Sequence, residues 1–469
     1  MSDYDEPRDE ALEERIAADP SAESYRVYSD WLQQHDNPRG ELIAVQTAME
    51  TATGPEWAKL KVRELELFDT HDAQLFGPLK KWNVARRAEL AWHRGFIRAV
   101  LGHSFREAMM ELFAHPSARF IERVLVDDTD ELNVHPNQPF TEVVTAGEKL
   151  DPVLALPGLK QLSMGRSTWA GELSHPELER LSWARPHHRW WPKMLAARLP
   201  KLKRFSSWIS DDTVEIASEV LAKFPLEVAR LEVDNIPEQV PRMHPGAAGK
   251  VGRLALHDTP TAWLGGLPDG FFSGVTTLEL DSITNPEAGA YFGDMPVMPK
   301  LTRVRLVHPT DRVRWFRGFA ASRLAKQVEH LELGVSKPEP GVAIASYEFP
   351  KLRSLDVRFD ASSTPQFLQS AQFFAGPAWN QVRVLELNAA GHVVTLAASP
   401  LGPVLEELTV RLDRDREGEL LLEHVAKLRA LKVLRLRGER VAEPKVIERL
   451  FALPLKVEWL GNQARSIWD

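Results

Sequence analysis

The sequence contains no cysteine among its 469 residues. Disulfide bonds, thiolate nucleophiles and cysteine-ligated zinc are therefore excluded, and a reducing compartment fits this composition. No run of eighteen apolar residues occurs, so no membrane-spanning helix is expected. The first fifteen residues are acidic and lack the apolar centre of a signal peptide, so the sequence predicts a cytoplasmic protein.

Positive charge is also in short supply. Fifty-eight Lys and Arg residues face 66 Asp and Glu residues, which gives a net charge of -8. A general nucleic-acid-binding protein needs a basic face, so this balance disfavours a nucleic-acid partner. The sequence also lacks the P-loop, GxGxxG, HExxH and GxSxG patterns, and it points to no cofactor and no catalytic residue.

One short phrase recurs along the chain: an apolar residue, Pro, a spacer, and then Leu-x-x-Leu-x-Leu. It reads LPGLKQLSM from Leu156, MPKLTRVRL from Met298 and FPKLRSLDV from Phe349. It returns without Pro as VARLEV from Val228 and as VTTLEL from Val275. Because strand side chains alternate between faces, the last two apolar positions of each phrase point to one side.

The spacing of the phrase indicates a repeat architecture. Eleven intervals separate Leu178 from Leu455, about 25 residues each. This period is typical of leucine-rich repeats, in which parallel strands stack and helical or irregular returns cover one face. We therefore expect an α/β solenoid over residues 91–469, a leucine-rich-repeat horseshoe with a parallel concave sheet.

Residues 1–90 follow a different pattern, one of short helices separated by turns. Apolar spacing predicts helices over 10–18, 22–34, 39–49 and 55–68. Asp19-Pro20-Ser21 and Asp36-Asn37-Pro38 interrupt them. We expect a small all-α domain here.

Two blocks in this region are distinctive: Tyr25-Arg26-Val27-Tyr28-Ser29-Asp30-Trp31-Leu32 and Asp36-Asn37-Pro38-Arg39-Gly40-Glu41-Leu42-Ile43. They resemble the repeat-companion domain that precedes leucine-rich repeats in myxobacterial and planctomycete proteins. The match covers roughly residues 8–50, and Arg94-Gly95-Phe96 resembles the junction before the first repeat strand in that family. The resemblance implies a bacterial protein and an architecture, and no activity.

Four residues of these blocks have two interpretations. Under the functional interpretation they form a docking site for a partner, made of Asp30, Trp31, Arg39 and Glu41. Under the structural one, Trp31 belongs to the core, while Asp30, Arg39 and Glu41 form caps and ion pairs that fix the turn.

The start of the array is less regular than the rest. Residues 97–101 are predicted as the first strand, because the next phrase begins 24 residues later at Ile121. The following interval, to Leu159, is 38 residues long and contains Asp127 to Glu131. An insertion loop is therefore predicted at 127–158.

The residues between the inward leucines form columns on the concave face. Arginines recur in one column and carboxylates in the next, so charges of both signs lie side by side. The candidate partner-binding residues are Arg180, Arg204, Trp208, Arg230, Glu232, Asp234, Arg253, His257, Glu279, Asp281, Arg303, Glu332 and Asp356.

These columns allow more than one interpretation. Neighbouring Arg and Glu or Asp residues can simply neutralise each other, each exposed pair contributing about 0 to 1 kcal/mol. Alternatively, the face binds a protein by charge complementarity, with arginines and Trp208 as anchors. Glu232, Glu279 and Glu332 would repel phosphates, which argues against a nucleic acid.

Two other strings are weak candidates for metal binding. His187 and His188 are adjacent within PHHRWW, so they point in different directions and chelate poorly together. Asp127 to Glu131 lacks the spacing of a calcium loop. A packed loop and a solvated loop are the better interpretations, and no metal is expected.

The sequence thus predicts a non-catalytic scaffold that binds an unidentified protein on its concave face. An enzyme that uses Asp, Glu and His on that face remains the alternative, as does a regulator that recruits its partner through the N-terminal helices. The oligomeric state does not follow from the sequence.

Overall fold

The computed structural model describes residues 6–81, 89–101, 111–126, 132, 139–145, 149–165, 169, 171–184, 186, 188–210, 213–234, 244–257, 270–281, 292–293, 295–307, 312–335, 338–359, 366–412, 415–438 and 444–461. The chain divides into two compact units. The first comprises Met1–Trp208 and Lys223–Glu227, and the second comprises Ile209–Ala222 and Val228–Asp469.

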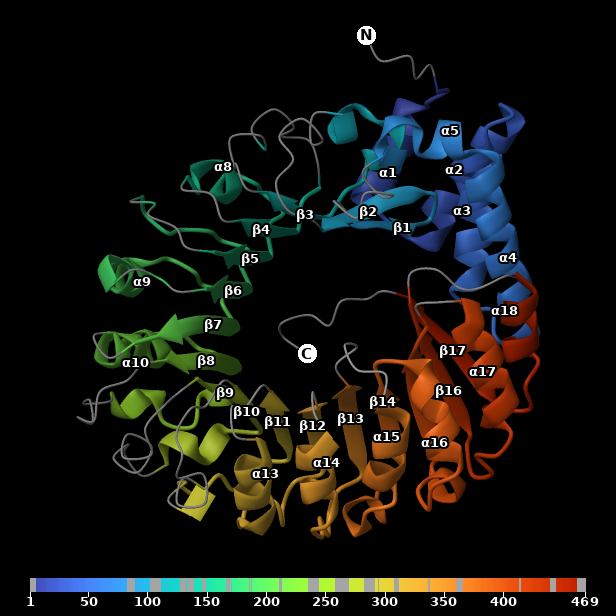
Figure 1. Ribbon diagram of the computed structural model, residues 1–469. Helices are drawn as coiled ribbons and strands as arrows, with labels where there is room; N and C mark the ends of the chain where they lie inside the picture. The colour runs from blue at the N-terminus through green and yellow to red at the C-terminus, as the bar shows by residue number, and fades with distance from the viewer. Residues whose placement is uncertain are drawn as a thin grey trace. The chain divides into compact units, whose positions relative to one another are not determined.

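The first unit begins with helices, which are drawn in blue beside β1 and β2 in Figure 1. They are α1 (Glu10–Ala18), α2 (Ala22–Gln34), α3 (Pro38–Met49), α4 (Gly54–Thr70), α5 (Asp72–Leu75) and η1 (Gly77–Leu79). Side chains of Asp9, Ser21 and Asn37 cap α1, α2 and α3 by accepting backbone N–H groups. The four longer helices lie within two residues of the ranges that apolar spacing predicts.

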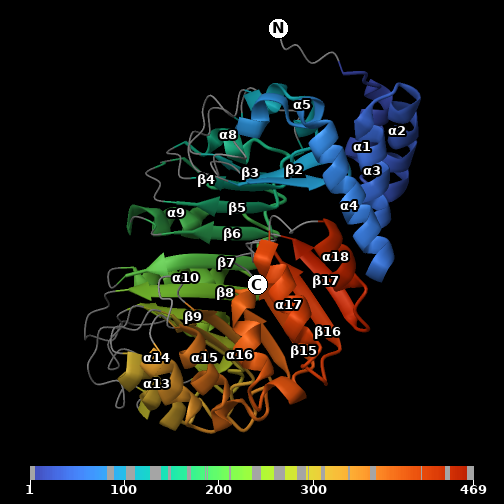
Figure 2. The ribbon, with the colours of Figure 1, turned by 45° about the vertical axis from the view of Figure 1, so that its right-hand side comes forward.

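These helices do not bury their apolar faces alone. Tyr25, Tyr28 and Ile43 share one hydrophobic cluster with Phe96, which opens strand β2, and with Phe120, which precedes β3. One core therefore spans the boundary at residue 90 that the sequence suggested. Figure 2 shows α1 to α4 gathered together in this part of the first unit.

Strands and short returns fill the rest of the first unit. The strands are β1 (Glu89–His93), β2 (Phe96–Leu101), β3 (Arg123–Val126), β4 (Glu142–Thr145), β5 (Gln161–Met164), β6 (Arg180–Trp183) and β7 (Arg204–Ile209). Their returns include η2 (Pro116–Ala118), α8 (Asp151–Leu154), η4 (His188–Trp190) and α9 (Trp191–Ala196). Strands β1 and β2 form an antiparallel hairpin, and each strand from β2 to β7 pairs in parallel with the next.

Strand β4 lies inside the segment 127–158 that the sequence assigned to an insertion loop. It pairs in register with β3 and with β5, so residues 142–145 form a further repeat strand. Its sequence, Glu-Val-Val-Thr, lacks leucine at the inward positions. Buried Val143 and Thr145 fill those positions instead, and a search for leucines does not find them.

The second unit repeats a strand and a return ten times. Its strands are β8 (Val228–Asp234), β9 (Val251–His257), β10 (Thr277–Asp281), β11 (Arg303–Val307), β12 (His330–Val335), β13 (Ser354–Phe359), β14 (Val384–Leu387), β15 (Glu407–Arg411), β16 (Val433–Arg437) and β17 (Lys456–Gly461). Its α-helices are α10 (Val214–Lys223), α13 (Arg312–Ala321), α14 (Pro338–Ala345), α15 (Gln366–Phe374), α16 (Val393–Ala397), α17 (Asp415–Val425) and α18 (Pro444–Phe451). Each strand pairs in parallel with its neighbour along the chain.

Matched register places the recurring leucines in rows. Leu278 aligns with Leu254 on one side and with Val304 on the other, and all three are at most 1% exposed. Within the second unit, helices α13 to α18 cover this side of the sheet (Figure 1). The prediction that the leucines point inward from parallel strands is confirmed. We call the opposite side, which carries the intervening residues, the open face.

Candidate functional site

On the open face of the second unit, in-register pairing aligns the charged residues into a row that crosses all ten strands. From β8 to β17 the row reads Glu232, Ala255, Glu279, Arg305, Glu332, Asp356, Glu386, Thr409, Arg435 and Glu458. Directly opposed side chains of neighbouring strands lie close enough to interact. Whether neighbouring side chains in this row attract or repel each other therefore depends on the charge that each of them carries.

Arg305 on β11 is the centre of the row. Its Nη1 lies 2.8 Å from Glu279 Oε1 and its Nε lies 2.9 Å from Glu332 Oε1. Glu279 and Glu332 are only 10% and 13% exposed at their side chains. Burial alone would lower the pKa of Arg305, but the two carboxylates raise it above its ordinary value.

Two further arginines extend this network from β8 to β13, with residues on five of these six strands. Arg230 on β8 lies 3.0 Å from Glu232 Oε1 and 3.4 Å from Glu279 Oε2. Arg358 on β13 lies 2.9 Å from Glu332 Oε1 and 3.9 Å from Asp356 Oδ2. We call the set Arg230, Glu232, Glu279, Arg305, Glu332, Asp356 and Arg358 the ion-pair network. Most of its carboxylates are thus already engaged by arginines of the same chain.

The candidate residues beside the network lie on the same face. Arg253 on β9 aligns with Arg230, and its pKa is lowered by burial and by the charge of Arg230. Arg303 on β11 is exposed. His330 on β12 aligns with Arg303, and its pKa is lowered by burial and by Arg303. This row of the open face is therefore basic.

The remaining candidates of the second unit lie at the carboxyl ends of β8 to β10. His257 and Asp281 align across β9 and β10, with 3.6 Å between Nδ1 and Oδ2. Asp234 lies on β8 opposite His257, but its side chain is outside the described part. Among the described residues, no group of three or more His, Asp or Glu side chains is placed to hold a metal ion.

The candidates of the first unit form a shorter polar row. Register aligns Arg123, Glu142, Gln161, Arg180 and Arg204 on β3 to β7. Glu142 accepts from Arg123 Nε at 2.5 Å and from Gln161 Nε2 at 2.9 Å. Arg180 donates to Gln161 Oε1 at 3.4 Å. Trp208 is half-buried farther along β7.

The candidate N-terminal docking residues do not act as one surface. Arg39 is fully buried: Nε donates to Glu6 Oε1 at 2.7 Å, and Nη1 donates to Gly95 O at 2.6 Å. Arg39 therefore joins the helices to the β1–β2 hairpin and is unavailable to a partner, which corrects its docking assignment.

The other three N-terminal candidates have separate surroundings. Trp31 is partly buried against the cluster and stacks on Tyr28, with ring centroids 5.9 Å apart. Glu41 accepts from Arg63 Nε at 2.6 Å. Asp30 is exposed.

Of the two weaker metal candidates, the structure describes only part of the PHHRWW string. Trp190 and Trp191 of the PHHRWW string are 3% and 1% exposed, and Trp190 stacks on Trp169 with centroids 5.3 Å apart. This string is a packed return, as one interpretation held. His187 and the run Asp127 to Glu131 lie outside the described residues.

Some residues that hold the charged groups together were not predicted from the sequence. Arg305 appears in the same sequence column as Glu279 and Glu332, but only the structural distances show that it joins them. Glu6 and Arg119 have no sequence signal, because their partners Arg39 and Glu13 lie 33 and 106 residues away.

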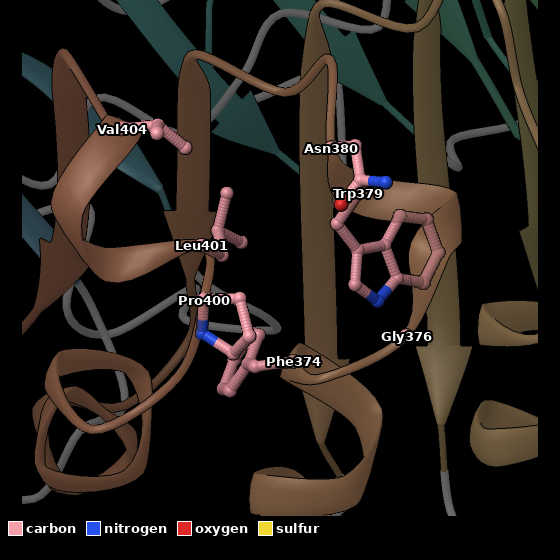
Figure 3. A pocket seen from close by; sticks show the side chains of 7 residues that line it. All are labelled: Phe374, Gly376, Trp379, Asn380, Pro400, Leu401 and Val404. Atoms are coloured by element: carbon pink, nitrogen blue, oxygen red, sulfur yellow. The ribbon is translucent and has the colours of Figure 1, made fainter.

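A small pocket lies between the returns that follow β13 and β14 (Figure 3). Its volume is about 240 Å³, and Phe374, Trp379, Pro400, Leu401 and Val404 supply most of its lining. Sites for drug-sized ligands are usually larger and contain several convergent polar groups. Asn380 is the polar side chain in this lining, so we treat the pocket as a gap between successive returns.

Comparisons with known proteins give little. No family model matches the chain, and no curated protein does. A crystal structure of a Bacteroides fragilis protein from a structural genomics programme shares 14% identity, with a TM-score of 0.32, over 56% of this chain and 74% of that one. In the part of the chain that the structure describes, no helix is long and apolar enough to cross a bilayer.

Proposed function

We propose that this chain is a leucine-rich-repeat solenoid that binds another protein on its open face and performs no catalysis. Parallel sheets are usually covered on both faces. In the second unit the helices cover one face, and the open face carries the ion-pair network across six strands. In the described part of the second unit, this charge-ordered face without a helical cover is the observation that carries the proposal.

The network favours binding because it holds its arginines in place. Arg305 and Arg358 are each held by two carboxylates at 2.8 to 3.9 Å. Side chains that are ordered before binding lose less conformational entropy when a partner arrives. Guanidinium groups also have five donors, so each can hold its carboxylates and still bond to a partner.

Affinity capture from cells that make the protein tests the proposal. Purified protein is compared with Arg303→Glu and with Arg449→Glu, which alters an exposed arginine of α18 on the helical side. We expect a protein that the parent and Arg449→Glu retain and that Arg303→Glu loses at least about tenfold. Retention of the same proteins by all three would contradict binding at the open face.

A further inference from the structure

Acidic and basic side chains of the open face differ in how far they are exposed to solvent. Side-chain exposure is 10% for Glu279, 13% for Glu332 and 13% for Asp356. It is 28% for Arg305 and 45% for Arg358. From β10 to β13 the carboxylates therefore lie deeper than the guanidinium groups, so a partner that approaches these strands meets cations first. On β8 the order is reversed, because Arg230 is 14% and Glu232 23% exposed.

This layering is clearest at the carboxyl ends of β13 to β16. Arg411 on β15 aligns with Arg437 on β16. Arg358 and Asn388 directly follow Val357 and Leu387, which align across β13 and β14, and Leu387 in turn aligns with Val410, the residue before Arg411. We call these four residues the strand-end cluster. Neighbouring strands lie about 4.8 Å apart, so the cluster spans roughly 15 Å.

Three of the four members present positive charge. Arg358 is 45% exposed, Arg437 is 29% exposed, and Arg411 is exposed. Glu386, which lies 3.6 Å from Arg437 Nε, is 23% exposed. The ends of these strands therefore carry an outward-facing cationic surface on a protein whose net charge is -8.

The floor of the cluster is held rigidly. Asn388 accepts from the backbone N–H of Phe359 at 3.0 Å and donates to the carbonyl of Phe359 at 2.7 Å. These two bonds tie the end of β14 to the end of β13. A backbone that is fixed at this point lets the neighbouring arginines bind with a smaller loss of conformational freedom.

From this geometry we propose that the strand-end cluster binds an acidic, Asp/Glu-rich segment of a protein partner. The proposal rests on the proposed function, because it names the chemistry that the open face recognises. Arginine forks bind carboxylates bidentately. Arg358 already pairs with Glu332 and Asp356, and Arg437 lies 3.6 Å from Glu386, so the arginines of the cluster bind carboxylate groups within the chain itself.

Fluorescence anisotropy with a labelled ten-residue polyglutamate peptide tests this assignment at physiological salt. The protein is compared with Arg411→Glu and, as a second variant, Arg358→Gln. Arg449→Glu is the control, and circular dichroism verifies that each variant is folded. We expect saturable binding that weakens at least about tenfold in Arg411→Glu, weakens in Arg358→Gln and stays unchanged in Arg449→Glu.

Competing results would overturn the assignment. Absence of peptide binding, or equal affinity in Arg411→Glu and the parent, would remove it. Tighter binding of a single-stranded decanucleotide at the same salt would replace the protein segment with a nucleic acid. Suppose that a partner is captured in an Arg303-dependent way but polyglutamate does not displace it: this result would contradict the present inference alone. Peptide binding without any captured partner would contradict the proposed function alone.

Discussion

Burial separates two arginines of the N-terminal helices that have the same kind of partner. Arg39 pairs with Glu6 in the interior, where the two side chains are 0% and 5% exposed. Burial raises the pKa of Glu6, but Arg39, Asn37 and Arg119 outweigh it and hold this pKa below its ordinary value. Arg63 pairs with Glu41 at the surface, where both side chains are more than 40% exposed.

Arg39→Met should therefore destabilise the first unit strongly. The change leaves the Glu6 carboxylate buried without its main counterion, a loss of about 3 to 5 kcal/mol in the free energy of unfolding. Urea denaturation at neutral pH measures it. Arg63→Met is the matched control and should have a much smaller effect, since exposed pairs contribute little. Equal effects would refute a structural role for Arg39.

Acid stability is a second property determined by single residues. Burial lowers the pKa of His392, which is 6% exposed, to about 4. Between pH 6.5 and 4 the unfolded chain binds this proton and the folded chain does not, so stability falls as the pH falls.

His392→Gln should flatten that pH dependence. Between pH 6.5 and pH 4, the free energy of unfolding should fall by up to about 3 kcal/mol less in the variant than in the parent. The variant lacks the histidine that takes up a proton on unfolding in this interval. Urea midpoints at a series of pH values measure the slope. A slope that persists in His392→Gln argues against this assignment.

At the scale of elements, close helix contact explains one glycine of the PRGELI block. A Cβ on Gly40 would lie 2.7 Å from Ser29 O and 2.8 Å from Gln33 N, both backbone atoms of α2. Helices α2 and α3 would have to separate to admit it. Ser29 Oγ also donates to Gly40 O at 2.6 Å, which joins the two helices at this crossing.

Gly40→Ala should lower the thermal midpoint of the first unit, with a loss of about 1 to 3 kcal/mol from overpacking. Gly158→Ala is the control, because its nearest neighbour would be an ordinary 3.5 Å from the new Cβ. Thermal unfolding followed by circular dichroism distinguishes them. Similar midpoints for the two variants would show that α2 and α3 are not in tight contact.

The sheet of the second unit depends on Arg305 in a comparable way. Arg305→Met leaves Glu279 and Glu332 as half-desolvated carboxylates on either side of β11, so we expect a loss of about 1 to 3 kcal/mol at neutral pH. Urea denaturation at neutral pH measures this loss, with Arg449→Met as the exposed control. Equal losses in the two variants would contradict a stabilising role of the Arg305 ion pairs.

At the scale of elements, the sequence predicts more of the fold than of the candidate site. Alternating apolar residues such as Leu278 and Leu280 suffice to predict the strands and their inward face, because burial requires a period of two. Glu-Val-Val-Thr of β4 lacks that leucine signal. Buried Arg39 reads as a surface residue, because its partners Glu6 and Gly95 are brought to it only by folding.

At the scale of the whole molecule, a protein of net charge -8 presents cations on the open face of its second unit. The carboxylates there are recessed and paired, while Arg303, Arg358 and Arg411 are exposed. General acidity suppresses contacts with anionic surfaces. On our proposal, local positive charge on this face gives selectivity for a partner with matching negative groups.

Photocrosslinking in cells that make the protein tests the central claim most directly. A photoreactive amino acid replaces Arg303 on the open face in one variant and Arg449 on α18 in another. The account predicts a discrete protein adduct from position 303 and none from position 449. An adduct from position 449 alone, or no adduct from position 303, would contradict an open face that binds a protein.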